Sequence, residues 1–431
     1  MKYYSTNKQA SLVDFKEATI SGQAPDKGLY FPEQLPAVEK ELIDDIEKYP
    51  DEEIAFRVIR PYVAGSIPDD KLMQIVKETI SFPIPLVKIS DTISTLELFH
   101  GPTLAFKDVG ARFMSRCLGY FVGGQNKKMT VLVATSGDTG GAVANGFYNV
   151  DGVEVVILYP SGKVSPVQEK QLTTLGKNIH ALEIEGNFDD CQRMVKEAFT
   201  DEELKKRKFL TSANSINVAR WLPQQFYYFL AYKQWADKSN PPVISVPSGN
   251  FGNICAGILA NRSGLPVKHF IAACNVNDVV SGYLQTQQLR PRGAVATLSN
   301  AMDVGNPSNF VRILEIFHHR FPELKSMLSS YTITDEETTH TIREVYAKYN
   351  YTLDPHGAVG YLALKRYLDD HTGDKGLFLE TAHPVKFPDA VEQYTGKKPE
   401  LPASVQGIMN SKKISTVMKP HYESLKDYLL R

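Results

Sequence analysis

One lysine has neighbours that would allow it to act as a nucleophile. Lys107 stands between Phe106 and Asp108, shortly after the turn-forming pair Gly101-Pro102. A lysine shielded by apolar neighbours loses part of its preference for the charged state, and its neutral amine can form a Schiff base with an aldehyde. Most lysines are solvated surface charges, so this interpretation requires a second sign of a bound aldehyde.

A loop suited to binding phosphate supplies that second sign. Residues 243–246 read as a strand and residues 254–260 as a helix, and between them lie Gly249, Asn250, Phe251, Gly252 and Asn253. Glycines let the backbone approach an anion, and the amides at a helix N-terminus attract it. A tight turn would explain the glycines but not the asparagines, which add side-chain donors. Pyridoxal phosphate carries both an aldehyde and a phosphate, so the two segments together favour it as cofactor.

Other nucleotide-binding classes fit less well. The loop lacks the Gly-Lys-Ser/Thr ending of a P-loop, which disfavours a nucleoside triphosphatase. A second loop has glycines at 137, 140 and 141, a spacing that does not match the dinucleotide fingerprint and makes a nicotinamide cofactor a weak alternative.

This second loop also joins a strand to a helix. It contains Ser136, Gly137, Asp138 and Thr139. Its hydroxyls and amides could hold a substrate carboxylate, and Asp138 could meet a polar substituent of a cofactor ring. A helix start capped by Ser136 or Thr139 explains the loop equally well.

Two further groups of polar residues are candidates for ligand contacts. Lys163, Ser215, Asn217 and Arg220 could surround a substrate phosphate. A helix cap at Ser215 with two solvated cations explains them at least as well. Thr381 follows a strand at residues 377–379 and could hydrogen-bond a ring nitrogen, whereas we interpret the nearby His383 as structural. His318 and His319 are adjacent and point apart, so no metal site is expected.

The bulk composition excludes several classes of protein. The 431 residues are 42% hydrophobic and 23% charged, with a formal charge of −1, so nothing points to nucleic acid or an acidic membrane as partner. The four cysteines are widely spaced, which fits a reducing cytoplasm. No apolar run suggests a signal peptide or a membrane span.

The order of strands and helices predicts an α/β protein. β-branched runs at residues 129–134, 153–158, 243–246 and 377–379 alternate with helix-compatible segments, as in a mainly parallel sheet covered by helices. Before them, helical stretches lie around residues 38–49 and 69–79. We predict a mostly helical N-terminal domain at 1–90, α/β subdomains at 91–240 and 241–400, and a helical tail at 401–431.

The motifs together resemble the threonine synthase family of the pyridoxal-phosphate fold type II superfamily. The resemblance extends over nearly the whole chain and includes the segments at residues 24–30, 100–108, 136–140 and 249–253. It implies two three-layer α/β/α subdomains. It also implies a cytoplasmic enzyme, a monomer or homodimer, that converts O-phospho-L-homoserine and water to L-threonine and phosphate by γ-elimination and β-addition of water, the last step of threonine biosynthesis.

The resemblance also implies roles for the candidate residues. Lys107 would hold the cofactor covalently and then act as a base. The cofactor contacts would come from Phe106, Asp138, Gly249, Asn250, Phe251, Gly252, Asn253 and Thr381. The substrate contacts would come from Ser136, Gly137 and Thr139 at the carboxylate and from Lys163, Ser215, Asn217 and Arg220 at the phosphate. Related lyases carry Asn where Asp138 stands, so here either the carboxylate or the cofactor's ring oxygen would have to carry a proton.

Two alternatives share these motifs. A threonine or serine dehydratase, or a phosphohomoserine lyase, would release 2-oxobutyrate. A pyridoxal-phosphate-binding module without catalysis would keep the cleft alone, although the intact lysine counts against it.

Overall fold

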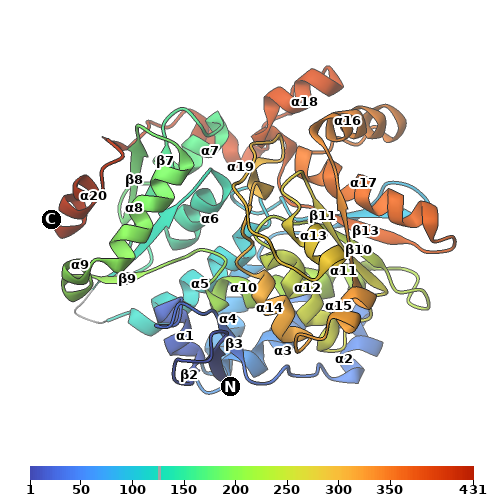
Figure 1. Cartoon of the computed structure of the whole chain (residues 1–431), viewed down its shortest axis with the longest axis horizontal. Helices are drawn as coiled ribbons and strands as arrows, with labels where there is room; N and C mark the ends of the chain where they lie inside the picture. The colour runs from blue at the N-terminus through green and yellow to red at the C-terminus, as the bar shows by residue number, and fades with distance from the viewer. Residues whose placement is uncertain (125–127) are drawn as a thin grey trace.

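The computed structural model describes residues 1–124 and 128–431. Within these ranges it contains one small antiparallel sheet and two larger, mainly parallel sheets. The two larger sheets and their helices form two lobes, one drawn mostly in green and the other in yellow and orange, and the blue N-terminal region lies below them (Figure 1). The predicted α/β fold with mainly parallel sheets is confirmed.

The N-terminal region combines a small sheet with helices. The sheet has the order β2-β1-β3, and every pair is antiparallel. The elements are β1 (Lys2–Ser5), β2 (Val13–Asp14), α1 (Phe15–Ser21), β3 (Tyr30–Pro32), α2 (Lys40–Asp44), η1 (Ile46–Lys48), α3 (Asp51–Val63) and α4 (Asp69–Thr79). The helix expected at 69–79 is confirmed, whereas the sheet was not foreseen because its strands are short and separated by turns.

The six-stranded sheet forms the core of one lobe. In spatial order its strands are β12 (Leu328–Thr332), β11 (His269–Cys274), β10 (Val243–Pro247), β13 (Gly376–Glu380), β5 (Ile93–Glu97) and β4 (Leu86–Lys88). All neighbours are parallel except β4, which runs antiparallel to β5. The strand β5 therefore lies in the same sheet as strands that follow residue 240.

Helices surround this sheet. They are α10 (Val218–Trp221), η2 (Leu222–Gln224), α11 (Gln225–Gln234), α12 (Gly252–Arg262), α13 (Val279–Thr286), η3 (Asn300–Met302), α14 (Phe310–Ile316), α15 (Phe321–Met327), α16 (Asp335–Tyr349), α17 (Pro355–Asp370), η4 (Pro384–Lys386) and α18 (Pro388–Thr395). Helix α17 packs directly on β10, β11 and β13.

The five-stranded sheet forms the core of the other lobe and is entirely parallel. In spatial order its strands are β14 (Thr416–Met418), β8 (Ile179–Ile184), β7 (Val153–Pro160), β6 (Met129–Ala134) and β9 (Phe209–Thr211). Its helices are α5 (Lys107–Val122), α6 (Asp138–Phe147), α7 (Pro166–Thr173), α8 (Phe188–Thr200), α9 (Glu202–Arg207), α19 (Ala403–Met409) and α20 (Tyr422–Leu430).

Alternate residues of β6 face different hydrophobic clusters. Leu132 belongs to the cluster that contains Met194 of α8, whereas Val131 and Val133 belong to the cluster that contains Phe113 of α5. Since successive side chains of a strand point to opposite faces, helices cover both faces of this sheet. This burial explains why every residue of the strand except Thr130 is apolar.

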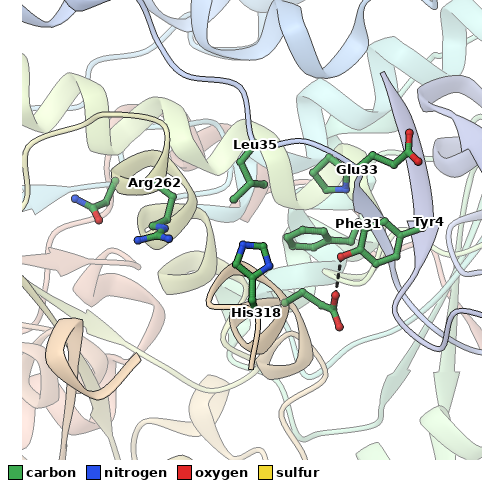
Figure 2. Close-up of a pocket in the computed structure, with 9 residues that line it drawn as sticks. Tyr4, Phe31, Glu33, Leu35, Arg262 and His318 are labelled. Carbon is green, nitrogen blue, oxygen red and sulfur yellow. Dashed lines mark hydrogen bonds between the residues drawn. The ribbon is translucent and has the colours of Figure 1, made fainter. Parts of the chain in front are cut away.

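A surface pocket lies where the N-terminal region meets α12 and α14. Figure 2 shows Tyr4, Phe31 and Leu35 facing Arg262 and His318 across it. The pocket has a volume of about 420 Å³. The Tyr4 hydroxyl donates to Glu315 Oε2 at 2.6 Å, which joins β1 to α14. None of the candidate site residues lines it.

Candidate active site

The segment that carries Lys107 is attached to the end of β13. The Phe106 amide donates to the Thr381 carbonyl at 3.0 Å, and the His383 amide donates to the Leu104 carbonyl at 3.1 Å. An isolated antiparallel bridge pairs Ala105 with Ala382 between these two bonds. Two segments far apart in the sequence, one with the lysine and one with Thr381, therefore lie side by side.

Asp108 stabilises the turn before the lysine. Its carboxylate accepts from the Thr103 amide at 2.9 Å and from the Thr103 hydroxyl at 2.5 Å. A β-carbon on Gly101 would lie 2.4 Å from Asp108 Oδ2, so glycine is required at this close approach. Burial raises the pKa of Asp108. The carboxylate next to Lys107 in the sequence is thus occupied by the turn.

Lys107 is the first residue of α5, and its side chain is largely buried, with 17% exposed. Its Nζ lies 5.0 Å from the centre of the Phe106 ring and 3.7 Å from Asp138 Oδ2. Burial lowers the pKa of Lys107, and the nearby cations of Lys386 and Arg220 lower it further, against the opposing pull of Asp138. These surroundings weaken the preference of Lys107 for its charged form, as its apolar neighbours in the sequence predicted.

Asp138 has closer partners than Lys107. Its Oδ1 lies 2.7 Å from Lys386 Nζ and accepts a hydrogen bond from Gln168 Nε2 at 2.9 Å. Burial alone would raise the pKa of Asp138, but the two lysine cations outweigh it and hold that pKa well below its usual range. The lowered pKa favours the charged carboxylate form of Asp138.

Neither Lys386 nor Gln168 was predicted from the sequence. Lys386 stands between Val385 and Phe387, the same apolar flanking that drew attention to Lys107, so a local signal was present. Gln168 had no such signal because it is a polar residue in an ordinary helix, α7.

The loop before α6 is held by the side chain of Thr135. The amides of Gly137 and Gly140 both donate to the Thr135 hydroxyl, at 3.0 and 2.8 Å. Gly137 has a φ of 139°, and a β-carbon there would lie 2.5 Å from the Gln168 amide carbon. The N-cap of α6 is Gly137 without a side-chain cap, so the alternative of a cap by Ser136 or Thr139 is wrong. Both hydroxyl residues are partly exposed at the carboxyl end of β6.

The expected phosphate loop links β10 to α12. No acceptor among the described residues takes a hydrogen bond from the backbone amides of residues 249–253. Phe251, with a φ of 61°, turns the chain into the helix. Amides without acceptors at a helix N-terminus fit an anion, so this loop fits the phosphate of pyridoxal phosphate.

The asparagines of this loop serve a different role from the one expected. Asn250 Nδ2 donates to Ser215 Oγ at 2.6 Å, and Asn250 Oδ1 accepts from the Ser308 amide at 2.6 Å. Asn253 Nδ2 donates to the Pro247 carbonyl at 2.9 Å. Their side chains hold the loop in place, which leaves the backbone amides as the donors for an anion.

The end of β13 contains Thr381 and His383. Thr381 is buried, with its carbonyl bonded to the lysine segment as described. The His383 ring nitrogen Nδ1 accepts from the Val385 amide at 3.1 Å and so caps η4. Burial lowers the pKa of His383 to about 4. A neutral histidine that caps a helix agrees with the structural interpretation.

The four candidates for a substrate phosphate occupy different surroundings. Ser215 Oγ also accepts from Asn309 Nδ2 at 3.2 Å, so Ser215 lies beside the phosphate loop. Asn217 caps α10 and donates to the Thr19 carbonyl at 2.8 Å. Lys163 lies on an exposed turn after β7, and within the described ranges no hydrogen bond or ion pair joins it to the other three. The structure thus brings Ser215 to the loop and leaves Lys163 apart.

Arg220 is the strongest anion donor of this group. It is 4% exposed, and its Nη1 donates to the Ala213 carbonyl at 3.0 Å while its buried Nε has no partner within the described chain. A β-carbon on Gly110 would lie 3.1 Å from that Nε, so the guanidinium lies against α5 one turn after Lys107. Burial lowers the pKa of Arg220 to about 10.

A second buried arginine, Arg312, was not predicted from the sequence. Arg312 donates to the carbonyls of Tyr30 and Ile216, at 3.0 and 2.6 Å, and to Asn309 Oδ1 at 2.7 Å. It thereby joins the N-terminal region to the segment that contains Ser215. Its partners are distant in the sequence, so no local pattern could indicate this role.

The fold and the site define a class of enzyme, and comparisons with known proteins agree. The family model described as "Pyridoxal-phosphate dependent enzyme" matches residues 89–379. The chain is thus an enzyme that uses pyridoxal phosphate. Two further family models, "Threonine synthase N terminus" and "Threonine synthase, C-terminal", match residues 2–80 and 357–429.

Individual relatives extend over the whole chain. A threonine synthase of Serratia marcescens is 44% identical over 431 residues, which cover 100% of this chain and 99% of that protein. The crystal structure of threonine synthase from Escherichia coli matches with a TM-score of 0.92 at 43% identity, covering 100% and 99% of the two chains. The structure of PLP-bound threonine synthase from Brucella melitensis matches with a TM-score of 0.94 at 38% identity and the same coverage. The chain belongs to the threonine synthase family.

The family membership confirms the resemblance, the fold class and the cofactor predicted from the sequence. It also identifies the chain as a lyase and disfavours the dehydratase and binding-module alternatives. The individual site residues stay predictions. Across the described ranges no helix is long and apolar enough to cross a membrane, and no cluster of three or more His, Cys, Asp or Glu side chains could hold a metal.

Proposed function

We propose that the chain converts O-phospho-L-homoserine and water to L-threonine and phosphate. In this reaction the bond between Cγ and the phosphate oxygen breaks, the hydroxyl of water adds to Cβ, and protons move between the substrate carbons. Bound pyridoxal phosphate supplies the aldehyde for a lysine and a ring that stabilises a carbanion beside it. The observation that carries the proposal is the buried amine of Lys107, 3.7 Å from Asp138.

In this proposal Lys107 attaches to the cofactor and then moves protons at the substrate carbons. Its lowered pKa supports both roles, because a base must be neutral before it takes a proton. The amides of residues 249–253 hold the cofactor phosphate, the Thr381 hydroxyl meets the ring nitrogen, and Phe106 and Asp138 contact the cofactor. These assignments are supported by the unpaired amides and by the placement of Thr381 beside the lysine segment.

The substrate contacts follow from the polar groups around the lysine. Ser136, Gly137 and Thr139 are proposed for the carboxylate, since they lie at the carboxyl end of β6 next to Asp138. Arg220 and Ser215 are proposed for the substrate phosphate because one has a free buried donor and the other lies beside Asn250. Lys163 and Asn217 complete the proposed set; Lys163 is exposed, and Asn217 caps α10. We also propose that the enzyme is cytoplasmic and is a monomer or a homodimer.

The test is a direct identification of products. The cofactor-loaded protein is incubated with O-phospho-L-homoserine, and phosphate, threonine and 2-oxobutyrate are quantified together. Equal amounts of phosphate and threonine are expected. Release of 2-oxobutyrate instead would indicate a lyase without water addition, and absence of phosphate release would contradict the proposed substrate.

A further inference from the structure

Lys386 is a buried cation to which the proposed function gives no role. It ends η4, shortly after Thr381, and its side chain is fully buried. Asp138 is its ion-pair partner, with Nζ and Oδ1 2.7 Å apart, and no other carboxylate in the described chain lies within ion-pair distance. Its ammonium makes no hydrogen bond of good angle, although the charges are in contact. Two lysines, Lys386 and Lys107, thus share one carboxylate.

The two lysines contact different oxygens of Asp138 at different distances. Lys386 is at 2.7 Å from Oδ1, and Lys107 is at 3.7 Å from Oδ2. Gln168 donates to the same Oδ1 as Lys386 and fixes that oxygen in place. Since Coulomb attraction grows as distance falls, the tighter pair is Lys386 with Asp138. Asp138 would otherwise have Lys107 as its single close cation.

The pairing of Asp138 with Lys386 affects the chemistry of Lys107. A carboxylate paired with Lys107 alone would favour its ammonium form, which has no lone pair for attack. The neutral amine of Lys107 can add to an aldehyde carbon, where a carbon–nitrogen double bond forms and the aldehyde oxygen leaves as water. A second cation on Asp138 therefore promotes the reactive form of Lys107.

We propose that Lys386 is a positioning residue that balances the charge of Asp138 and thereby leaves Lys107 free to lose its proton. The inference rests on the proposed attachment of the cofactor to Lys107. It also explains why the carboxylate at residue 138 is compatible with a cofactor site, since its charge is balanced within the protein. The pair joins η4, which follows β13, to α6, so it also links the two large sheets.

A purely structural ion pair would hold the two lobes together without changing Lys107. The experiment must therefore measure the amine of Lys107 itself. The full-length protein without cofactor is labelled with acetic anhydride over a series of pH values, and peptide mass spectrometry quantifies acetylation at Lys107. The exposed Lys412 serves as the internal reference. Wild type, Lys386→Met, Lys386→Arg and Lys386→Met with Asp138→Asn are compared.

Loss of the Lys386 charge should shift the titration of Lys107 upward. At pH values well below the pKa of wild-type Lys107, we expect about tenfold less acetylation in Lys386→Met, equivalent to an upward shift of one pH unit. Lys386→Arg keeps the charge and should stay within about twofold of wild type, and the double variant should regain wild-type labelling or exceed it, because no carboxylate remains. Wild-type labelling of Lys107 in a folded Lys386→Met would overturn the proposal.

Two additions keep the result interpretable. If Lys386→Met does not fold, Lys386→Gln removes the charge but keeps a donor for Asp138, and the same tenfold loss is expected. Borohydride reduction of the wild-type holoenzyme, followed by peptide mapping, identifies the lysine that holds the cofactor. If the cofactor is on Lys107 but labelling of Lys107 is unchanged in Lys386→Met or Lys386→Gln, this inference alone is overturned. Cofactor on Lys386 overturns the proposed site as well.

Discussion

The amide of Phe106 donates a hydrogen bond of 3.0 Å to the carbonyl of Thr381. This bond attaches the lysine segment, which precedes α5, to the strand end that is proposed to meet the cofactor's ring nitrogen. Movement of β13 would therefore move the amine of Lys107 together with the Thr381 hydroxyl. The relative position of the proposed attachment point and the proposed nitrogen contact is set by backbone groups.

Substitution of Lys107 by alanine should abolish both cofactor attachment and product formation. No other buried amine occupies the start of α5, and loss of a residue that moves protons typically costs about a thousandfold in rate. The visible absorbance of bound cofactor and the amount of threonine formed would be measured together. Lys88→Ala, which removes an exposed lysine, is the control and should behave as wild type. Full turnover by Lys107→Ala would refute the assignment.

Substitution of Gly249 by alanine should weaken cofactor binding. A β-carbon there would lie 2.7 Å from the Met302 Cα, so the loop or η3 would have to shift, at a cost of roughly 1–3 kcal/mol. Since the loop is proposed to hold the cofactor phosphate, we expect about a tenfold rise in the dissociation constant of pyridoxal phosphate, measured by fluorescence titration.

Gly282→Ala is the matched control for this substitution. Gly282 lies in α13, and a β-carbon there would have no neighbour within 4 Å. Alanine should leave cofactor affinity unchanged and raise the free energy of unfolding by up to about 1 kcal/mol. If both variants bound pyridoxal phosphate with equal affinity, Gly249 would not belong to the site for the cofactor phosphate.

Much of the fold could be predicted because the buried strands carry their own signal. Residues 129–134 form β6 as expected, since a strand covered on both faces is mostly apolar along its length. The edge strand β14 was not predicted because Thr416 and Val417 are exposed, so no hydrophobic pattern distinguishes them from the polar tail.

The candidate site could be predicted only in part. Lys107 was found because its apolar neighbours adjoin it in the sequence, whereas the partners of Asp138 are set by tertiary structure. The sequence places the Asp108 carboxylate next to Lys107, but in the structure this carboxylate bonds Thr103. The carboxylate close to the Lys107 amine is that of Asp138. The directions of the Lys107 and Asp108 side chains depend on the turn at Leu104, which has a φ of 58°. The spacing of residues in the sequence does not reveal this turn.

Substitution of Arg220 by alanine should affect substrate binding more than cofactor binding. The unpartnered Nε is proposed to reach the substrate phosphate, and a charged hydrogen bond of this kind contributes roughly 2 kcal/mol, or about thirtyfold in KM. The KM for O-phospho-L-homoserine and the dissociation constant of pyridoxal phosphate would be measured side by side. Arg262→Ala, at the exposed end of α12, is the control. If the affinities for substrate and for pyridoxal phosphate fell equally, the assignment of Arg220 to the substrate phosphate would be wrong.

His383 should make the protein sensitive to mild acid. Burial lowers its folded-state pKa to about 4, while an unfolded histidine titrates near 6.5, so the unfolded chain binds more protons between these values. The contribution of the neutral His383 to the free energy of unfolding is therefore complete above about pH 6.5 and is lost as the pH falls towards 4. At pH 4.5 the loss is about 2 kcal/mol. Urea unfolding at pH 7 and 4.5 would measure it against His383→Asn, which keeps an acceptor for the Val385 amide but does not titrate. The same loss of stability in both proteins would assign the acid sensitivity to other groups.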